Sequence, residues 1–471
     1  MNLFAISLRN LRVRLVSTAL TALSVSLGAA LVAALWSLAD QADERYARSI
    51  RGYKAIVGPA EGSKLDLTLN VVLNLGDSPG VVPLRVLSEL ERLERSNSRF
   101  KHYAFPQVRG DSVQGFPVIG TTDLWFTKFS LEKLDTDTGT RPPLEFASGG
   151  PWSFGNDQLF PFAESMAEVY NHELLHDAAG EEGHSHNHDH EHQSYGDLVP
   201  IDWRKAVLGA EAAAVMGIGV GESITPVHGT EDSDLAHEHP EAQCEVIGVL
   251  KKTGSAIDRS IYVPAPVMLA LSGHRDGSFD QEKLEPAAED LLLSAIVLRT
   301  FDHRGADFFQ RHFRSSKDAQ VAWPQGEIVK LLEAIGDAKE VLHVIAWLVV
   351  LVSSLGVLVA LYNTMNERRR EIAIMRSLGA RRSQIFSIIV VEAVALSLVG
   401  ATLGVLLCHL GLSVAGGWIE DRAGIPVDGS AFLREELYLV LGLGLLGGLA
   451  GVLPAVKASR TEVQEHLTPT T

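Results

Sequence analysis

Four long apolar segments lie near the ends of the chain and leave a polar interval between them. The first covers residues 15–39, and the others cover residues 338–366, 384–418 and 437–456. Each has about 20 residues or more with few charges, enough for an α-helix to cross a bilayer core roughly 30 Å thick. The pattern therefore predicts four membrane-spanning helices, with residues 40–337 inserted between the first and the second.

The inserted residues 40–337 mix helical and extended patterns. The stretch PLRVLSELERLERS, residues 83–96, repeats apolar positions at helical spacing. Gly248, Gly254 and the alternation in RSIYV, residues 259–263, predict a hairpin of short strands. We therefore expect an α-helical membrane protein with four transmembrane helices and a large α+β extracytoplasmic domain inserted between helices 1 and 2.

Arginine and lysine mark one side of the membrane. They precede the first span in residues 1–14, crowd the link at 367–383 and return in the tail at 457–471, whereas the link at 419–436 is net acidic. Basic residues near span ends stay in the cytoplasm, so both termini and the arginine-rich link are expected inside and residues 40–337 outside. The first apolar run is too long for a signal peptide and no clean A-x-A site follows it, so we expect an uncleaved helix.

The composition argues against two classes of protein. A formal net charge of −17 does not suit a nucleic-acid binder, whose phosphate contacts need a basic surface. No GxxxxGK[ST] motif occurs, so we do not expect this chain to hydrolyse ATP by itself. Its two cysteines, Cys244 and Cys408, form neither a CxxC pair nor a disulfide framework and say little about the redox compartment.

The link at 367–383 carries an amphipathic pattern as well as its arginines. Ile372, Met375 and Leu378 recur every three residues, which predicts one apolar stripe on a short helix. Gly379 is a helix stop, and Ser383 can cap the next helix. The arginines could serve only as topology markers, but an apolar stripe rimmed by arginine is typical of a surface that binds another protein.

This link resembles the signature of FtsX/MacB-type ABC transporter permeases. The matching stretch is NERRREIAIMRSLGARRSQI, residues 366–385. Residues 7–28 and 447–467 are similar to the entry helix, first span, last span and tail of the family, although Glu462 stands where members often have proline. Residues 206–224 and 244–268 resemble the periplasmic core domain of MacB-type permeases.

The resemblance implies a mechanical role in the bacterial inner membrane. In this family, a short cytoplasmic coupling helix between the second and third spans sits in a cleft of a separate ABC ATPase subunit. Members form dimers with a second permease copy, and their outer domains drive export, extraction or periplasmic work, some with a periplasmic or outer-membrane partner. The coupling residues carried over are Glu367, Arg368, Arg369, Arg370, Glu371, Ile372, Met375, Arg376, Leu378 and Gly379.

A second role within the same family is a cell-division-type FtsX regulator, which signals to periplasmic cell-wall hydrolases and transports nothing. The predicted outer domain, residues 40–337, is large, and a large outer domain favours the MacB-like role. The resemblance alone leaves both roles open.

Polar and glycine positions inside the spans have two interpretations each. Glu392 matches an acidic residue common in the third span of the family, and it is either functional or paired with Arg381 or Arg382. His343 and His409 lie near span ends and are expected at the membrane interface. Glycines of the fourth span allow close packing, either at a dimer seam or within one subunit: Gly442, Gly444, Gly447, Gly448 and Gly451.

A histidine tract at about residues 172–193 fits no shared family pattern. In its second half, five histidines alternate with polar and acidic residues, so an extended chain would align the imidazoles along one edge. Imidazole and carboxylate suit zinc or another transition metal. The alternatives are a solvated insert that catches metal loosely and a sensor that responds to protonation. The metal candidates are His172, His176, His184, His186, His188, His190, His192, His237 and His239.

The stretch HELLH, residues 172–176, also reads as the zinc-protease motif HExxH. In such a site His172 and His176 would hold zinc and Glu173 would activate water. Short matches arise by chance in a histidine-rich chain, and a dry, fixed cavity is hard to build beside a polar acidic run. We therefore favour structural or storage metal binding over a membrane-anchored metalloprotease and assign no catalytic residue.

Overall fold

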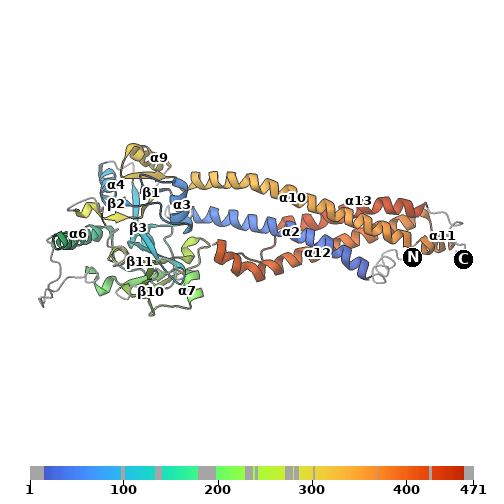
Figure 1. The fold of residues 1–471 in the computed structure, drawn as a ribbon, viewed down its shortest axis with the longest axis horizontal. Coiled ribbons are helices and arrows are strands. Elements are labelled where there is room, and N and C mark those ends of the chain that lie inside the picture. Colours follow the sequence, from blue (N-terminus) through green and yellow to red (C-terminus); the bar gives the residue numbers. More distant parts are fainter. Residues whose placement is uncertain are drawn as a thin grey trace. The chain divides into compact units, whose positions relative to one another are not determined.

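The computed structural model describes residues 15–96, 101–132, 141–178, 198–228, 237–238, 242–270, 279, 286–300, 303–367, 369–423 and 427–460. The chain divides into two compact units. One, the helical unit, is Met1–Glu44 with Glu333–Thr471, and the other, the sheet unit, is Arg45–Leu332. Figure 1 colours the elements of both units along the sequence. The sheet unit thus begins and ends a few residues away from the predicted bounds of 40 and 337.

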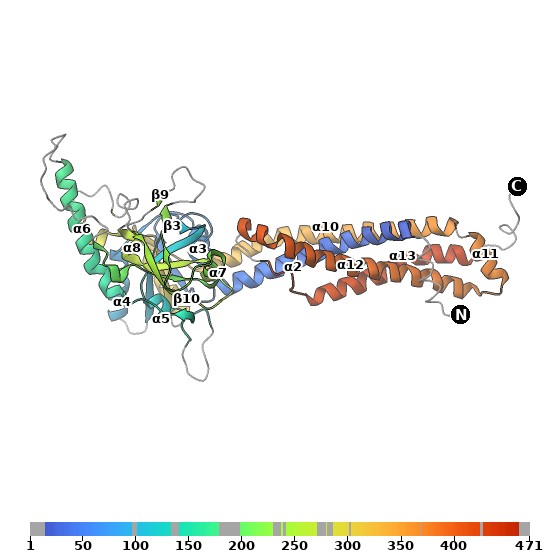
Figure 2. The ribbon, with the colours of Figure 1, turned by 90° about the horizontal axis from the view of Figure 1, so that it is seen from below.

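The helical unit contains the apolar helices that the hydropathy pattern predicts. Within it, helices α2 and α10 carry the first two spans, and α12 and α13 run alongside one another in both views of the fold (Figures 1 and 2). Among the described residues, four helices are long and apolar enough to cross a membrane, and the sheet-rich segment lies between the first and the second in the sequence, as predicted. The helices are α2 (Leu15–Ser49), α10 (Pro324–Glu367), α11 (Arg369–Ser377), α12 (Arg382–Ala423) and α13 (Arg434–Ser459).

Helix α2 continues past residue 39, where the sequence pattern placed the end of the first span. It ends at Ser49, after the segment DQADERYARS. Alanine, glutamine, glutamate and arginine all favour a helix, so the chain keeps its helical conformation after it becomes too polar for a bilayer. Helix α10 likewise begins at Pro324, well before the predicted span at 338. Hydropathy thus located the apolar part of each helix but not the ends of the helix itself.

The sheet unit is built on a 12-stranded sheet flanked by helices. Its main path runs β14-β1-β13-β3-β4-β11-β6-β10-β5, with β7, β8 and β9 attached at its side. The strands are β1 (Ala55–Pro59), β3 (His102–Val113), β4 (Phe116–Thr121), β5 (Phe146–Gly149), β6 (Lys205–Leu208), β7 (Ser223–Ile224), β8 (Val227–His228), β9 (His237–Glu238), β10 (Cys244–Leu250), β11 (Ile261–Pro264), β13 (Ala295–Thr300) and β14 (Ala319–Ala322), with β2 (Val82–Pro83) and β12 (Leu292–Leu293) in a separate pair.

The helices of the sheet unit pack against the sheet and share its hydrophobic core. The helices are α3 (Lys64–Leu73), α4 (Arg85–Ser96), α5 (Leu124–Lys128), α6 (Asn156–Ala178), α7 (Ala210–Met216), α8 (Ala265–Leu269) and α9 (His303–His312). Helix α4 matches the predicted amphipathic helix, with Val86, Leu87 and Leu90 buried. Trp125 of α5 is fully buried and stacks on Phe129 with ring centroids 4.0 Å apart. Strands and helices share one core, as expected of an α+β domain.

The predicted hairpin at Gly248 and Gly254 is wrong. Strands β10 and β11 do not pair with each other, because β6 lies between them, parallel to β10 and antiparallel to β11. Residues 251–260 form a turn in which Asp258 accepts hydrogen bonds from the amides of Thr253 (2.8 Å) and Gly254 (2.7 Å). Hairpin loops have roughly 2–5 residues, so this longer connection leaves room for a third strand.

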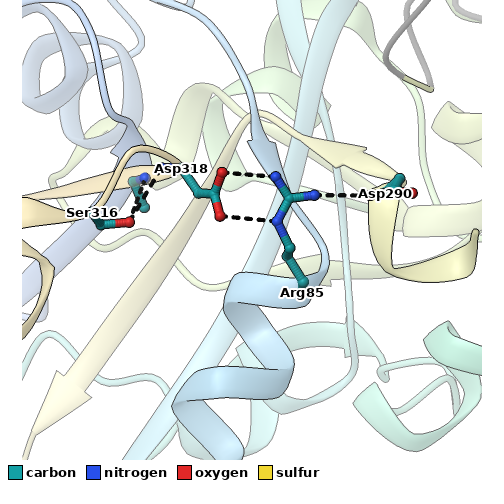
Figure 3. Close-up of polar contacts among 5 residues, drawn as sticks. Arg85, Asp290, Ser316 and Asp318 are labelled. Atoms are coloured by element: carbon teal, nitrogen blue, oxygen red, sulfur yellow. Dashed lines mark hydrogen bonds and ion pairs between the residues drawn. The ribbon is translucent and has the colours of Figure 1, made fainter. Parts of the chain in front are cut away.

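An arginine network ties three segments of the sheet unit together (Figure 3). Arg85, at the start of α4, donates two hydrogen bonds to Asp318, from Nε (2.9 Å) and Nη2 (2.7 Å). Its Nη1 donates to Asp290 at 2.8 Å. Asp290 in turn accepts from the amide of Ala287 at 3.1 Å, and Ser316 accepts from the amide of Asp318 at 3.2 Å. A bidentate guanidinium–carboxylate pair of this kind is stronger than a single ion pair.

Replacing Arg85 by alanine is expected to destabilise the sheet unit by about 1–2 kcal/mol, because the buried Asp290 and the partly exposed Asp318 lose a charged donor. Thermal unfolding of the full chain in detergent measures this as a fall in Tm of roughly 2–4 °C for each kcal/mol. Arg95→Ala is the matched control, because Arg95 is exposed and its described ion pair is with Glu91, one turn earlier on the same helix. Equal Tm values for the two variants would show that the network contributes nothing.

Candidate partner-binding site

Helix α11 follows α10 and precedes α12 in the sequence, and a turn at Gly379 ends it. Gly379 has a φ of 96°, a conformation that other residues rarely adopt. The amide of Gly379 donates to Arg376 O (3.0 Å) and the amide of Ala380 donates to Met375 O (3.0 Å). These two bonds form a Schellman motif, which confirms the predicted helix stop at Gly379.

The next helix begins differently from the prediction. Helix α12 starts at Arg382, so Ser383 is already inside it. Gln384 Oε1 accepts a hydrogen bond from the amide of Arg381 at 2.8 Å, and this side chain takes the role expected of Ser383. The reach back from the third helical position to the cap amide is half of a capping box. The turn between α11 and α12 is therefore fixed on both sides.

One face of α11 packs into the helical unit. Ile372 is 3% exposed and Ala373 is also buried, while Met375 is half-buried. Ile372 and Met375 belong to a cluster that takes members from three other helices. These members are Met365 of α10, Ile385 and Ile389 of α12, and Ala455 and Ala458 of α13. A force on α11 therefore acts on apolar contacts with all three helices.

The opposite face of α11 exposes two apolar side chains beside the exposed Glu371. Ile374 is 43% exposed and Leu378 is 82% exposed. The sequence pattern placed Leu378 on one stripe with Ile372 and Met375, and this differs from the structure. At about 100° per residue, positions three apart drift around the helix, whereas Ile374 and Leu378, four apart, stay on one face. The spacing of Ile374 and Leu378 was the signal that could have identified this face.

The charged residues of the link are described only in part. Glu371, in the first turn of α11, is exposed, and Arg376, in its last turn, is half-buried. This order of charges suits the helix dipole. Arg381 and Arg382 are exposed beside the turn. The side chains of Glu367, Arg368, Arg369 and Arg370, which the sequence also assigned to coupling, lie outside the described residues.

Glycines of α13 pack against α12 of the same chain. A Cβ on Gly447 would lie 1.8 Å from Ser397 Oγ, and one on Gly451 would lie 2.7 Å from Ala393 Cβ. Gly444 and Gly448 similarly face Leu398 and Val394 of α12, whereas Gly442 has open space around it. These contacts support packing within one subunit as the role of four of the five glycines.

Glu392 lies on α12 and is 5% exposed. It follows Arg382 by ten positions, which is about 15 Å along the helix axis. This separation does not favour the predicted pairing with Arg381 or Arg382. Its burial agrees with the expectation of a polar residue inside the span.

Few of the metal candidates fall on described side chains. His172 is exposed on α6, and His176 follows one turn later on the same helix, so their backbone spacing is the one expected. His237, on β9, is in register with His228 on β8, which in turn is in register with Asp111 on β3. His184, His186, His188, His190, His192 and His239 lie outside the described residues. Among the side chains that the structure describes, no three potential ligands gather as a metal site.

Comparison with known proteins points to one family. Residues 343–463, which include α11, match the family described as FtsX-like permease C-terminal. The uncharacterized ABC transporter permease YknZ of Bacillus subtilis (strain 168) is 29% identical over 233 residues, 47% of this chain and 53% of the relative. The macrolide export ATP-binding/permease protein MacB of Burkholderia thailandensis is 28% identical over 222 residues, 46% of this chain and 32% of the relative.

A third relative is the pyoverdine export ATP-binding/permease protein PvdT of Pseudomonas savastanoi pv. phaseolicola. It is 27% identical over 263 residues, 55% of this chain and 38% of the relative. The chain therefore spans 32–53% of the length of these curated relatives. Together the matches confirm the resemblance to FtsX/MacB-type ABC transporter permeases.

Proposed function

We propose that this chain, an ABC transporter permease of the FtsX/MacB type, is the membrane subunit on which a separate cytoplasmic ATPase acts through α11. The observation that carries the proposal is the division of α11 into two apolar faces. One face is buried against α10, α12 and α13, and the other exposes Ile374 and Leu378. An exposed apolar pair on a short, rigidly capped helix suits the cleft of a partner protein.

Because one face of α11 is buried against three helices, α11 is packed into the helical unit and can transmit force to those helices. Removing Ile372 from its cluster would expose a side chain whose burial is worth about 1.5–3 kcal/mol. A push on Leu378 is therefore expected to move α11 together with the ends of the helices around it. Helix α10 then continues from Glu367 back to Pro324, with no proline after its first residue to kink it. We propose that this helix carries the motion towards the sheet unit.

The sheet unit is proposed to do its work outside the cytoplasm, in the bacterial inner membrane, with a second permease copy alongside. Two of the relatives are exporters by name, one of macrolides and one of pyoverdine. These names support export as the class of function, and the cargo follows from neither. A regulator that changes the shape of the sheet unit without moving cargo is the second role consistent with the same site.

The proposal is tested by co-expressing the full chain with ABC ATPase subunits of the same genome and measuring ATP hydrolysis of the purified complex in nanodiscs. We expect a stable complex whose ATPase rate exceeds that of the ATPase alone. An ATPase that neither copurifies nor responds to the permease would remove the proposed function.

Side-specific labelling is expected to place Leu378 inside the cell and the sheet unit outside. Cys244 is buried, and burial raises the pKa of its thiol to about 12, so it stays neutral and unreactive up to at least pH 9. Its pKa is raised on folding, so the stability that it contributes is complete below the unfolded value of 9 and is lost as the pH rises towards 12.

Cys408, the other native cysteine, is buried as well. Maleimide labelling should therefore report only the cysteines introduced at exposed Val215 and Leu378. In intact cells, an impermeant maleimide should label Val215→Cys, and it should label Leu378→Cys only after permeabilisation. Labelling of both positions from the same side would contradict the orientation.

We propose a narrower second role, transition-metal binding by the sheet unit, because two placements favour it. His172 and His176 are one turn apart on α6, and Asp111, His228 and His237 occupy one row across three neighbouring strands. Residues directly opposite on antiparallel strands lie within about 5.5 Å of one another at Cα. Carboxylate and imidazole are ligands that zinc accepts.

Calorimetric titration of the full chain with zinc measures this role. Loss of one binding event in Asp111→Asn with His237→Ala, and its retention after deletion of residues 183–193, would assign metal to the strand row. Retention in the first variant and loss after the deletion would assign it to the tract. An absence of heat in the wild type would end the metal hypothesis. Glu173→Gln, with unchanged function, would exclude zinc-protease chemistry.

A further inference from the structure

The connecting segment, residues 427–433 before α13, returns close to the backbone of α12. A Cβ added at Gly429 would lie 2.2 Å from Ser413 Oγ and 2.6 Å from Ser413 N. No side chain fits at that separation, so glycine is required for the backbone to lie there. The position brings the carbonyl of Gly429 within 2.8 Å of His409 Nδ1, one turn before Ser413 on α12.

His409 also meets a carboxylate, and both groups are buried. Its Nε2 lies 2.9 Å from Glu436 Oε2 on α13, with His409 7% and Glu436 2% exposed. The carbonyl of Gly429 only accepts hydrogen bonds, so Nδ1 carries a proton. The contact between Nε2 and Oε2 then holds one shared proton, on either atom. His409 thus bonds at once to the connecting segment and to the next helix, and its side chain is buried in protein.

A third helix joins the same segment through Gln41 of α2. Gln41 Oε1 accepts from the amide of Asp428 at 2.8 Å, and its Nε2 donates to the carbonyl of Asp428 at 3.1 Å. The same Nε2 donates to Ser37 Oγ at 2.9 Å, which fixes the amide on its own helix. Two bonds to one residue form the pattern of a strand pair, so α2 holds the backbone of the connecting segment and not a mobile side chain.

Hydrogen bonds between residues of the segment itself also stabilise its conformation. Asp428 Oδ1 accepts from the amide of Ser430 at 2.8 Å and from its hydroxyl at 2.6 Å. The ring of Phe432 covers the imidazole of His409, with ring centroids 3.9 Å apart. These contacts stabilise the conformation that the segment has in this structure.

We infer that Gln41, His409, Ser413, Asp428, Gly429 and Glu436 form a clamp that keeps α2, α12 and α13 together as one block while the ATPase acts on α11. The inference rests on the proposed function of α11. His409 lies 27 positions after Arg382, about 40 Å along α12 from the end that meets α11. The clamp therefore fixes the far end of the three helices. When α11 moves, α10 is then expected to shift relative to the block formed by α2, α12 and α13.

Hydrogen exchange in the full chain, in nanodiscs and without an ATPase, tests the clamp itself. The amides of residues 427–433 should be protected in the wild type and should exchange about 10-fold faster in His409→Phe and in Glu436→Ala. Glu436→Gln should restore protection, because its amide can donate to Nε2. Glu435→Ala, a change at an exposed neighbour, is the control. Wild-type exchange rates in His409→Phe would overturn the clamp.

The same measurement with the ATPase bound and trapped with ATP and vanadate tests whether the clamp stays closed. Protection of residues 427–433 should be unchanged, and its loss would overturn the inference. Glu436→Ala should lower the maximal stimulated ATPase rate several-fold without changing the ATPase concentration that gives half-maximal stimulation. A change in that concentration alone would mean that the pair acts on docking and not on the block. If no ATPase responds at all, the proposed function fails while the exchange data still decide the clamp.

Discussion

Leu378→Glu is expected to abolish stimulation of the partner ATPase while leaving the permease folded. Leu378 is 82% exposed, so the change removes little packing within the chain. At the interface it would place a carboxylate in an apolar cleft, where a central residue is worth about 2 kcal/mol or more. We expect stimulation of ATP hydrolysis to fall at least about 10-fold, since 1.4 kcal/mol corresponds to that factor. Tm of the purified chain should not change.

Two neighbours on α11 control for this result. Ile372→Glu puts a charge into the buried cluster and should lower Tm, which separates loss of folding from loss of docking. Ser377→Glu adds the same charge at an exposed polar position and should keep most of the stimulation. Full stimulation in Leu378→Glu would show that the ATPase binds elsewhere.

Gly404→Val is expected to destabilise the helical unit by forcing α2 and α12 apart. A Cβ at Gly404 would lie 2.4 Å from the carbonyl oxygen of Ser26 and 2.6 Å from Ala29 Cβ on α2. Both are backbone or backbone-attached atoms that cannot rotate away, so the two helices must separate. Overpacking of this kind costs about 1–3 kcal/mol even in adaptable cores, and we expect the upper end of this range.

Gly411→Val is the matched control on the same helix, because a Cβ there meets nothing within 4 Å. Thermal unfolding in detergent should show a lower Tm for Gly404→Val and a Tm close to wild type for Gly411→Val. Equal Tm values would mean that α2 and α12 do not depend on their close approach at Gly404.

The sequence was sufficient where the physics is local. Span positions follow from the cost of placing charges in lipid, and this cost does not depend on neighbouring segments. The stop at Gly379 follows from its freedom to adopt positive φ, and helix α4 follows from its apolar spacing. The resemblance of the link to a coupling helix was carried by contiguous residues for the same reason.

Features that depend on distant residues were missed. The His409–Glu436 pair joins positions 27 apart, and nothing in either flank signals the other. Strand β6 separates β10 from β11, although local turn residues predicted a hairpin. The sequence pattern placed exposed Leu378 on one face with buried Ile372, because residues three apart were assumed to share a face of the helix. Each miss arose where tertiary packing, and not local preference, selects the arrangement.

The central claim is that ATP-driven movement at α11 reaches the sheet unit. Hydrogen exchange of residues 45–332, measured in the nanodisc complex with and without ATP and vanadate, tests it most directly. Wild-type permease should show changed exchange in the sheet unit on trapping, and Leu378→Glu should show none. Stimulated ATP hydrolysis with identical sheet-unit exchange in both nucleotide states would contradict the account.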